Sequence, residues 1–100
     1  MKKKFILITG CSSGIGYSTS KYLKKNNFNV IASCRKIKDV NKLSKDFEYS
    51  IQLDLVSTRS IKSACRLIKK IIKKQNLYAI FCNSGYGLYG ALEDLNRTPE

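Results

Sequence analysis

The chain has no histidine or tryptophan and only one proline among its 100 residues. Its four cysteines, Cys11, Cys34, Cys65 and Cys82, are widely spaced and form no C-x-x-C pair. Without histidine or paired cysteines, the sequence predicts neither a zinc site nor a disulfide framework, so we expect reduced thiols in or near the core. Cys11 lies in a glycine-rich turn, and we expect it to be the thiol that reagents can reach.

Long apolar runs are also missing. No stretch approaches the roughly 20 residues that span a bilayer, so the sequence predicts no membrane span. The apolar run at residues 5–8 follows a lysine cluster but is too short for the core of a signal peptide, and Thr9-Gly10 ends it. We therefore predict a first strand here and a cytoplasmic protein.

Acidic residues are scarce, because seven Asp and Glu stand against 19 Lys and Arg, for a formal net charge of +12. Such an excess is typical of nucleic-acid-binding proteins. Here, however, pairs such as Lys69-Lys70 and Lys73-Lys74 punctuate an apolar helical pattern, and no aromatic residues interleave with them. We predict solvated helix faces, no nucleic-acid partner, and attraction for an anionic cofactor.

Short β-favouring runs alternate with helical patterns along the chain. Strands are predicted at residues 4–9, 28–34, 49–53 and 77–82, with helices at about 15–25, over the apolar positions 37–47, and after Ser57 over the apolar positions 61–72. This alternation predicts βαβ units. The expected fold class is therefore α/β, a Rossmann-like doubly wound parallel sheet of four strands in the order 3-2-1-4 with three helices.

The three helices differ in the strength of their patterns. In the first helix, the spacing places Ile15, Thr19, Tyr22 and Leu23 on one face. In the second, Ile37, Val40, Leu43 and Phe47 recur at helical spacing. The third follows Ser57, a good N-cap, and its apolar positions recur three and four residues apart: Ile61, Ala64, Cys65, Ile68, Ile71 and Ile72.

The end of the sequence has the composition of a helix start. Residues 83–90 carry three glycines and are predicted to form a loop. Thr98-Pro99-Glu100 then offers an N-cap threonine, a proline at the first helical position and an acid in the first turn. We therefore expect residues 1–100 to be the N-terminal part of one dinucleotide-binding domain, with its C-terminal half absent from this chain.

A glycine-rich turn joins the first predicted strand to the first helix. Glycines there let the backbone turn tightly, and the helix N-terminus can then hold a pyrophosphate through backbone N–H groups. No Gly-Lys-Ser/Thr follows, which excludes a P-loop. A tight turn without a ligand is the alternative. The predicted cofactor-binding residues are Gly10, Ser12, Ser13, Gly14, Ile15 and Gly16.

The second predicted strand ends in Ser33-Cys34-Arg35-Lys36, where dinucleotide-binding folds usually place an acid for the ribose 2′-hydroxyl. A carboxylate would repel a 2′-phosphate, whereas a guanidinium pairs with it in a forked geometry. Arg35, helped by Ser33 and Lys36, therefore predicts NADP as the cofactor, with NAD less favoured. The alternative is that Arg35 only ends the strand.

Asp54 follows the third predicted strand, at the carboxyl edge of the sheet where the nucleotide crevice lies. We expect its carboxylate to accept a hydrogen bond from an adenine amino group or a loop N–H. A purely local role, supporting the helix that starts after Ser57, is the alternative.

The segment TGCSSGIG resembles the TGxxxGxG fingerprint of the short-chain dehydrogenase/reductase family in its single-domain form. Asp54-Leu55 resembles that family's adenine-contacting aspartate pair. The segment with Asn83 and Gly85 is similar to its NNAG motif, in which the asparagine steadies the sheet and the segment lines the cofactor ribose. Residues 85–90 resemble members that act on lipophilic carbonyls. The resemblance implies cofactor contacts for Leu55, Asn83 and Gly85.

The resemblance implies an NADP-dependent oxidoreductase that transfers hydride to or from a small carbonyl or alcohol and forms a homo-oligomer when complete. The family's catalytic residues lie beyond this chain, so no catalytic residue is predicted and the chain alone is expected to be inactive. Tyr17 and Lys21 have a Tyr-x-x-x-Lys spacing, but they lie in the helix after the glycine turn and are not that pair. The alternative hypothesis is a non-catalytic dinucleotide sensor or interaction module that binds an acidic partner.

Overall fold

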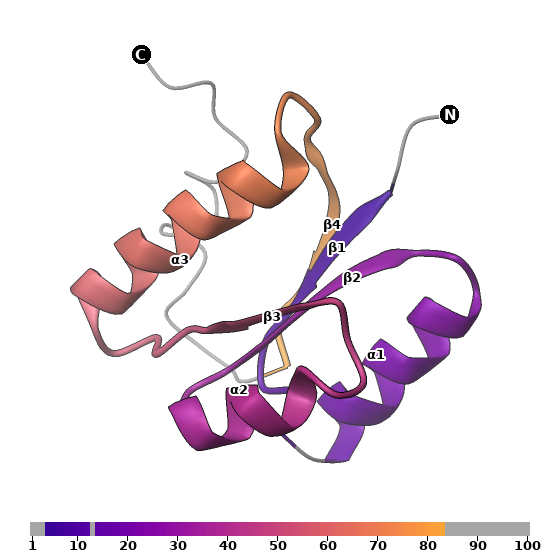
Figure 1. The fold of residues 1–100 in the computed structure, drawn as a ribbon, viewed down its shortest axis with the longest axis horizontal. Helices are drawn as coiled ribbons and strands as arrows, with labels where there is room; N and C mark the ends of the chain where they lie inside the picture. Colours follow the sequence, from indigo (N-terminus) through magenta and orange to yellow (C-terminus); the bar gives the residue numbers. More distant parts are fainter. Residues whose placement is uncertain (1–3, 13, 84–100) are drawn as a thin grey trace.

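A computed structural model describes residues 4–12 and 14–83 of the chain. They form a parallel four-stranded sheet in the order β3-β2-β1-β4 (Figure 1). Its elements, in chain order, are β1 (Phe5–Ile8), α1 (Gly14–Lys25), β2 (Asn29–Cys34), α2 (Ile37–Leu43), β3 (Tyr49–Gln52), α3 (Thr58–Ile72) and β4 (Leu77–Phe81). The predicted fold class and strand order are confirmed, and the strand ends differ from the predicted ones by no more than one residue.

The sheet separates two apolar cores, because successive strand residues point to opposite faces. Phe5 and Leu7 of β1 pack with α3 on one face. Ile6 and Ile8 pack on the other face with α1 and α2. All four residues of β1 are therefore buried, which is why this strand reads as a continuous apolar run rather than an alternating one.

Helix α3 follows its sequence pattern closely. The Ser57 hydroxyl accepts a hydrogen bond from the backbone N–H of Ser60 at 3.1 Å, as an N-cap does. Ala64, Ile68 and Ile72 are buried against the sheet, and each large apolar side chain buried in this way stabilises the fold by roughly 1.5–3 kcal/mol. None of the described helices combines the length and apolarity that crossing a membrane requires.

Helix α1 packs on the sheet through small residues. Gly16 and Ser20 are buried, whereas Ile15 and Tyr22 are 69% and 66% exposed. The face predicted from Ile15, Thr19, Tyr22 and Leu23 is therefore not the one that packs centrally on the sheet. The Ser20 hydroxyl donates to the Gly16 carbonyl at 2.7 Å, so burying this polar group leaves it satisfied.

Helix α2 ends at Leu43, earlier than the predicted residue 47. The chain turns after Ser44, and the backbone N–H groups of Asp46 and Phe47 both donate to the Leu43 carbonyl at 2.9 Å. Phe47 is nevertheless buried. The apolar spacing therefore identified a core residue correctly and its secondary structure wrongly, because a turn also returns a side chain to the same core.

Tyr17 links α1 to the turn after α2. Its hydroxyl donates to Asp46 Oδ2 at 2.7 Å, and its ring meets the Phe47 ring edge-on with centroids 6.1 Å apart. Lys24 also donates to the Asp46 backbone carbonyl, and Lys21 lies over the Tyr17 ring with Nζ 5.6 Å from its centroid. These contacts give Tyr17 and Lys21 a structural role.

Replacing Tyr17 with phenylalanine should lower the free energy of unfolding by about 1 kcal/mol, because it removes the hydrogen bond to Asp46 and keeps the ring contact. In a thermal melt this corresponds to a decrease in Tm of roughly 4–8 °C. Tyr22→Phe is the matched control, since Tyr22 is exposed on the same helix and should leave Tm unchanged. Equal melting of wild type and Tyr17→Phe would contradict the role given to this contact.

Candidate functional site

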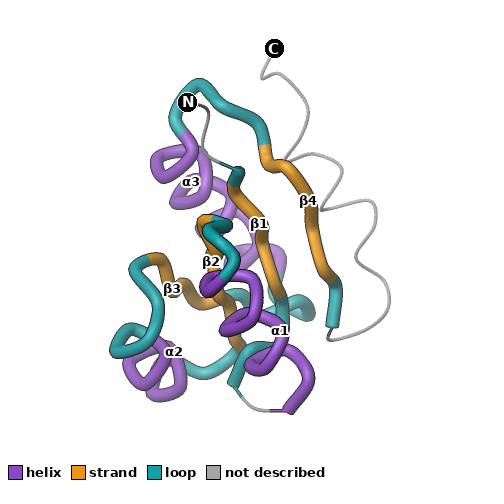
Figure 2. The backbone as a smooth tube through the Cα atoms, turned by 90° about the vertical axis from the view of Figure 1, so that its right-hand side faces the viewer, coloured by secondary structure: helices purple, strands orange, loops and turns teal. Residues whose placement is uncertain are grey.

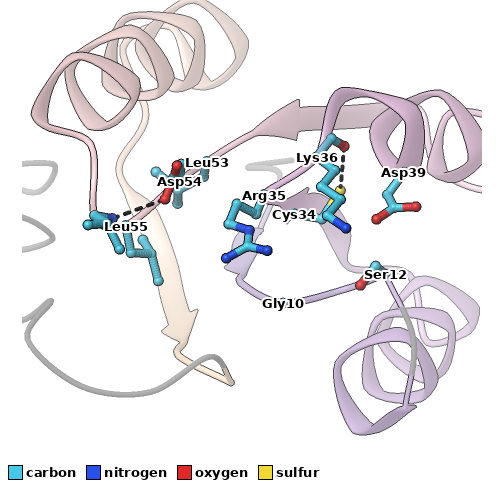
Figure 3. Close-up of a pocket in the computed structure, with 10 residues that line it drawn as sticks. Gly10, Ser12, Cys34, Arg35, Lys36, Asp39, Leu53, Asp54 and Leu55 are labelled. Carbon is cyan, nitrogen blue, oxygen red and sulfur yellow. Dashed lines mark hydrogen bonds between the residues drawn. The ribbon is translucent and has the colours of Figure 1, made fainter.

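The carboxyl ends of β1, β2 and β3 border a pocket of about 460 Å³ (Figure 3). Six residues predicted from the sequence line it together: Gly10, Ser12, Arg35, Lys36, Asp54 and Leu55. They are joined there by Cys34, Asp39, Leu53 and Val56. Carboxyl ends of parallel strands are where open α/β sheets bind ligands.

The glycine turn has a backbone that only glycine adopts without strain. Gly10 and Gly14 have φ of 67° and 64°, in the left-handed region. Gly16 is needed for space instead, because a Cβ there would lie 2.3 Å from the Gly10 oxygen. The start of α1 is therefore packed directly against the turn. Ser13 lies outside the described residues.

Asn83, just after β4, holds this turn in place. Its backbone N–H donates to Thr9 Oγ1 at 3.0 Å, and its side-chain Nδ2 donates to the Gly10 carbonyl at 3.2 Å. Asn83 thereby fixes the turn from the opposite end of the described chain, in agreement with the sheet-steadying role implied by resemblance. Gly85, the other predicted residue of this segment, lies outside the described residues.

Cationic side chains lie at the end of β2. Arg35 and Lys36 are exposed, and Figure 3 shows Arg35 extending from the strand end, with Asp54 and Ser12 on opposite sides of it in this view. Ser33 does not join them. It is fully buried and donates its hydroxyl to the Ile8 carbonyl at 2.9 Å, so its prediction as a helper to Arg35 is wrong. The reason is that Ser33 lies within β2 and bonds to the neighbouring strand β1, whereas Arg35 lies just past the end of β2 at Cys34.

Asp39 is a pocket residue that the sequence interpretation missed. It lies in the first turn of α2 and lines the pocket with Arg35 and Lys36. An acid four residues after the strand-ending arginine was visible in the sequence. That Arg35 and Asp39 line the same pocket follows from the short connection between β2 and α2, which the sequence alone does not show.

Asp54 has the local role considered for it and also lines the pocket. Its Oδ1 accepts the Val56 N–H at 3.1 Å, and its backbone carbonyl accepts the Ser57 N–H at 3.1 Å. Its own N–H donates to Ser60 Oγ at 2.9 Å, so it supports the start of α3. Because the residue also lines the pocket, the local contacts orient a carboxylate toward the space where a ligand would lie.

Cys11 is not the reachable thiol that its place in the turn predicted. It is fully buried, with Sγ 3.1 Å from the Ile8 carbonyl oxygen and 3.3 Å from Ser20 Oγ, because its side chain turns toward the interface of α1 and the sheet. Burial raises its pKa. Burial and the nearby Asp39 raise the pKa of Cys34 to about 11. Both thiols therefore stay protonated near neutral pH. No three metal-ligating side chains gather within residues 4–12 and 14–83.

Known proteins are similar to this chain in sequence and in fold. The sequence pattern of the family described as short chain dehydrogenase matches residues 4–98. The chain belongs to this family. The short-chain dehydrogenase/reductase resemblance of the glycine turn is thereby confirmed.

Two curated short-chain dehydrogenase relatives illustrate the match. The uncharacterized oxidoreductase YbbO of Escherichia coli K12 is 39% identical over 95 residues, covering 95% of this chain and 35% of that protein. Short-chain dehydrogenase/reductase family 9C member 7 of Homo sapiens is 34% identical over 91 residues, covering 88% of this chain and 29% of that protein. The chain thus spans about a third of the length of these relatives.

The fold recurs in solved structures. An NADPH-bound carbonyl reductase from chicken fatty liver superimposes with a TM-score of 0.71 at 24% identity, covering 86% of this chain and 36% of that one. At this identity the likeness establishes the fold alone.

Proposed function

We propose that the protein is an NADP-dependent oxidoreductase acting on a small carbonyl or alcohol, and that the described residues are its cofactor-binding part. The observation that carries this proposal is Arg35 at the end of β2, lining the same pocket as the glycine turn. Family membership supports an oxidoreductase, and the NADPH-bound carbonyl reductase with the same fold supports the cofactor.

The residues present fit such a cofactor. The left-handed Gly10 and the glycine-only space at Gly16 leave the turn open to a pyrophosphate, and the α1 N-terminus adds a favourable dipole. Ser12 offers an exposed hydroxyl there. In this proposal Gly14, Ile15 and the undescribed Ser13 complete the phosphate-binding segment, as the sequence predicts.

The other end of the pocket would hold the adenosine. Arg35 and Lys36 are exposed and cationic, as a 2′-phosphate requires. Asp54 would accept from the adenine amino group while Leu55 contributes apolar surface, and the segment of Asn83 and Gly85 would lie along a ribose. When bound, the nicotinamide supplies or accepts the hydride. We expect residues 1–100 alone to bind cofactor without turnover; homo-oligomer formation and cytoplasmic location stay predictions.

The test is a titration of the purified protein with NADPH and NADH, followed by thermal melting. NADPH should raise Tm more than NADH at equal concentration, because only NADPH brings a phosphate to Arg35; a ligand at about 100 times its Kd adds roughly 2.7 kcal/mol of stability. The fragments 2′,5′-ADP and 5′-AMP provide a matched pair that differs only in the 2′-phosphate. Equal shifts for both pairs, or preference for NADH, would contradict the proposal.

A further inference from the structure

A second pocket, of about 530 Å³, lies on the open edge of the sheet. β3 is the outermost strand, on the side away from β4, with α2 on one face of it and α3 on the other (Figure 2). The pocket is lined by β3, by Ile37 and Val40 of α2 and by Arg59, Ser63 and Leu67 of α3. Asp54 is its only lining residue in common with the dinucleotide pocket. We call this space the β3 groove.

The floor of the β3 groove offers unpaired backbone groups. The Leu53 N–H donates to the Cys34 carbonyl at 2.9 Å, toward β2. In a parallel ladder the direction alternates, so Ile51 also faces β2, whereas the N–H and C=O groups of Ser50 and Gln52 face outward. No residue in the described part of the chain pairs with these outward groups. A free strand edge of this kind is a template for another strand.

The walls of the β3 groove are partly apolar. Ile37 and Leu67 are 56% and 45% exposed, on opposite sides of the strand. Ile51 and Val40 contribute apolar surface between them. An extended segment laid along β3 would place alternate side chains toward these residues and remove them from water.

The rim of the β3 groove on α3 is cationic. Arg59 lines the groove, and helical spacing places Arg66 and Lys70 on the flank next to Ser63 and Leu67. Asp54 is the one acid in the lining, and its carboxylate already accepts the Val56 N–H. A second copy of the chain would bring the same cations against each other across the edge. The charge therefore favours an acidic partner over self-association.

We propose that the β3 groove binds an extended acidic peptide segment of a partner protein, which adds a strand to β3 and places its carboxylates against Arg59 and its flanking cations. Backbone hydrogen bonds to Ser50 and Gln52 provide the pairing, and the apolar walls accept alternate side chains. Arg59 and Ser63 line the β3 groove but not the dinucleotide pocket, so a substitution at Arg59 is expected to leave cofactor binding unchanged.

The probe is a fluorescein-labelled peptide of alternating glutamate and valine, titrated with the purified protein and read by fluorescence polarisation. We expect saturable binding that weakens with salt, and about fivefold weaker binding to Arg59→Glu. Lys25→Glu is the matched control, since it makes the same charge change at the exposed end of α1 and should alter the affinity by less than about twofold. NADPH titration of both variants verifies folding and should match the wild type.

A second peptide separates strand addition from general attraction between charges. Methylating alternate backbone nitrogens on one edge of the peptide removes its donors and keeps its charge, and this should abolish binding if a strand is added. Unchanged binding of the methylated peptide, equal loss in Lys25→Glu, or displacement of the peptide by an equally charged single-stranded oligonucleotide would overturn the proposal. So would the absence of saturable binding at low salt.

Discussion

Gly16→Ala should abolish dinucleotide binding and lower the free energy of unfolding by about 3 kcal/mol. The added Cβ would lie 2.3 Å from the Gly10 oxygen and 2.9 Å from Asn83 Nδ2, both shorter than real contacts of a methyl group. The same Gly10 oxygen accepts the Asn83 hydrogen bond, so moving it also loosens the end of β4. Helix α1 or the turn at Gly10 has to move, which distorts the segment proposed to hold the pyrophosphate.

Gly14→Ala is the matched control for this variant. Gly14 has a left-handed φ of 64°, unlike Gly16, and nothing lies within 4 Å of a Cβ added there. Gly14→Ala should therefore lower the free energy of unfolding by about 1 kcal/mol, the cost of the backbone strain alone. Denaturant unfolding and NADPH titration of the two variants measure the difference. Equal destabilisation of the two variants would contradict the role given to the close approach of α1 at Gly16.

Arg35→Asp should reverse the cofactor preference. NADPH affinity should fall about 100-fold, because the variant removes charge-assisted hydrogen bonds of roughly 1.5–3 kcal/mol and adds a like charge beside the 2′-phosphate. NADH affinity should change by less than about threefold, since its 2′-hydroxyl can donate to the new carboxylate. Isothermal titration calorimetry with both cofactors gives the two dissociation constants directly.

Two further variants make the Arg35 result specific. Lys38→Asp makes the same change of charge nearby on α2 but does not line the pocket, so it should leave the NADPH to NADH ratio unchanged. Arg35→Lys keeps the charge and loses the planar fork, so an intermediate ratio is expected. A ratio that moves equally in Lys38→Asp and Arg35→Asp would show that net charge alone, and not Arg35, selects the cofactor.

Much of the fold was predictable from the sequence because the apolar signal is strong where burial is complete. The continuous run of β1 is buried on both faces, and the spacing of Ala64, Ile68 and Ile72 in α3 marks the face that packs on the sheet. The strand order followed from the handedness of βαβ connections. Arg35 and Asp54 were identifiable as pocket residues because each follows a strand at the carboxyl edge.

Small residues account for what the sequence did not reveal. Helix α1 packs on the sheet through Gly16 and Ser20, whose hydropathy does not mark them as core residues. The prediction relied on the larger Ile15 and therefore placed the buried face of the helix wrongly. Cys11 and Ser33 are short side chains whose direction depends on how tightly the turn folds back onto the sheet. Their burial is a property of three-dimensional packing and has no counterpart in composition or spacing.

The two hydrogen bonds of Asn83 join residues 74 and 73 positions apart, to Thr9 and Gly10. Contacts of such sequence separation form late in folding, because closing the long loop costs entropy before the contact compensates for it. At a ribosomal rate of about 5–20 residues per second, β1 and the glycine turn wait several seconds for their anchor. The glycine turn therefore reaches its described geometry only after residue 83 has been made.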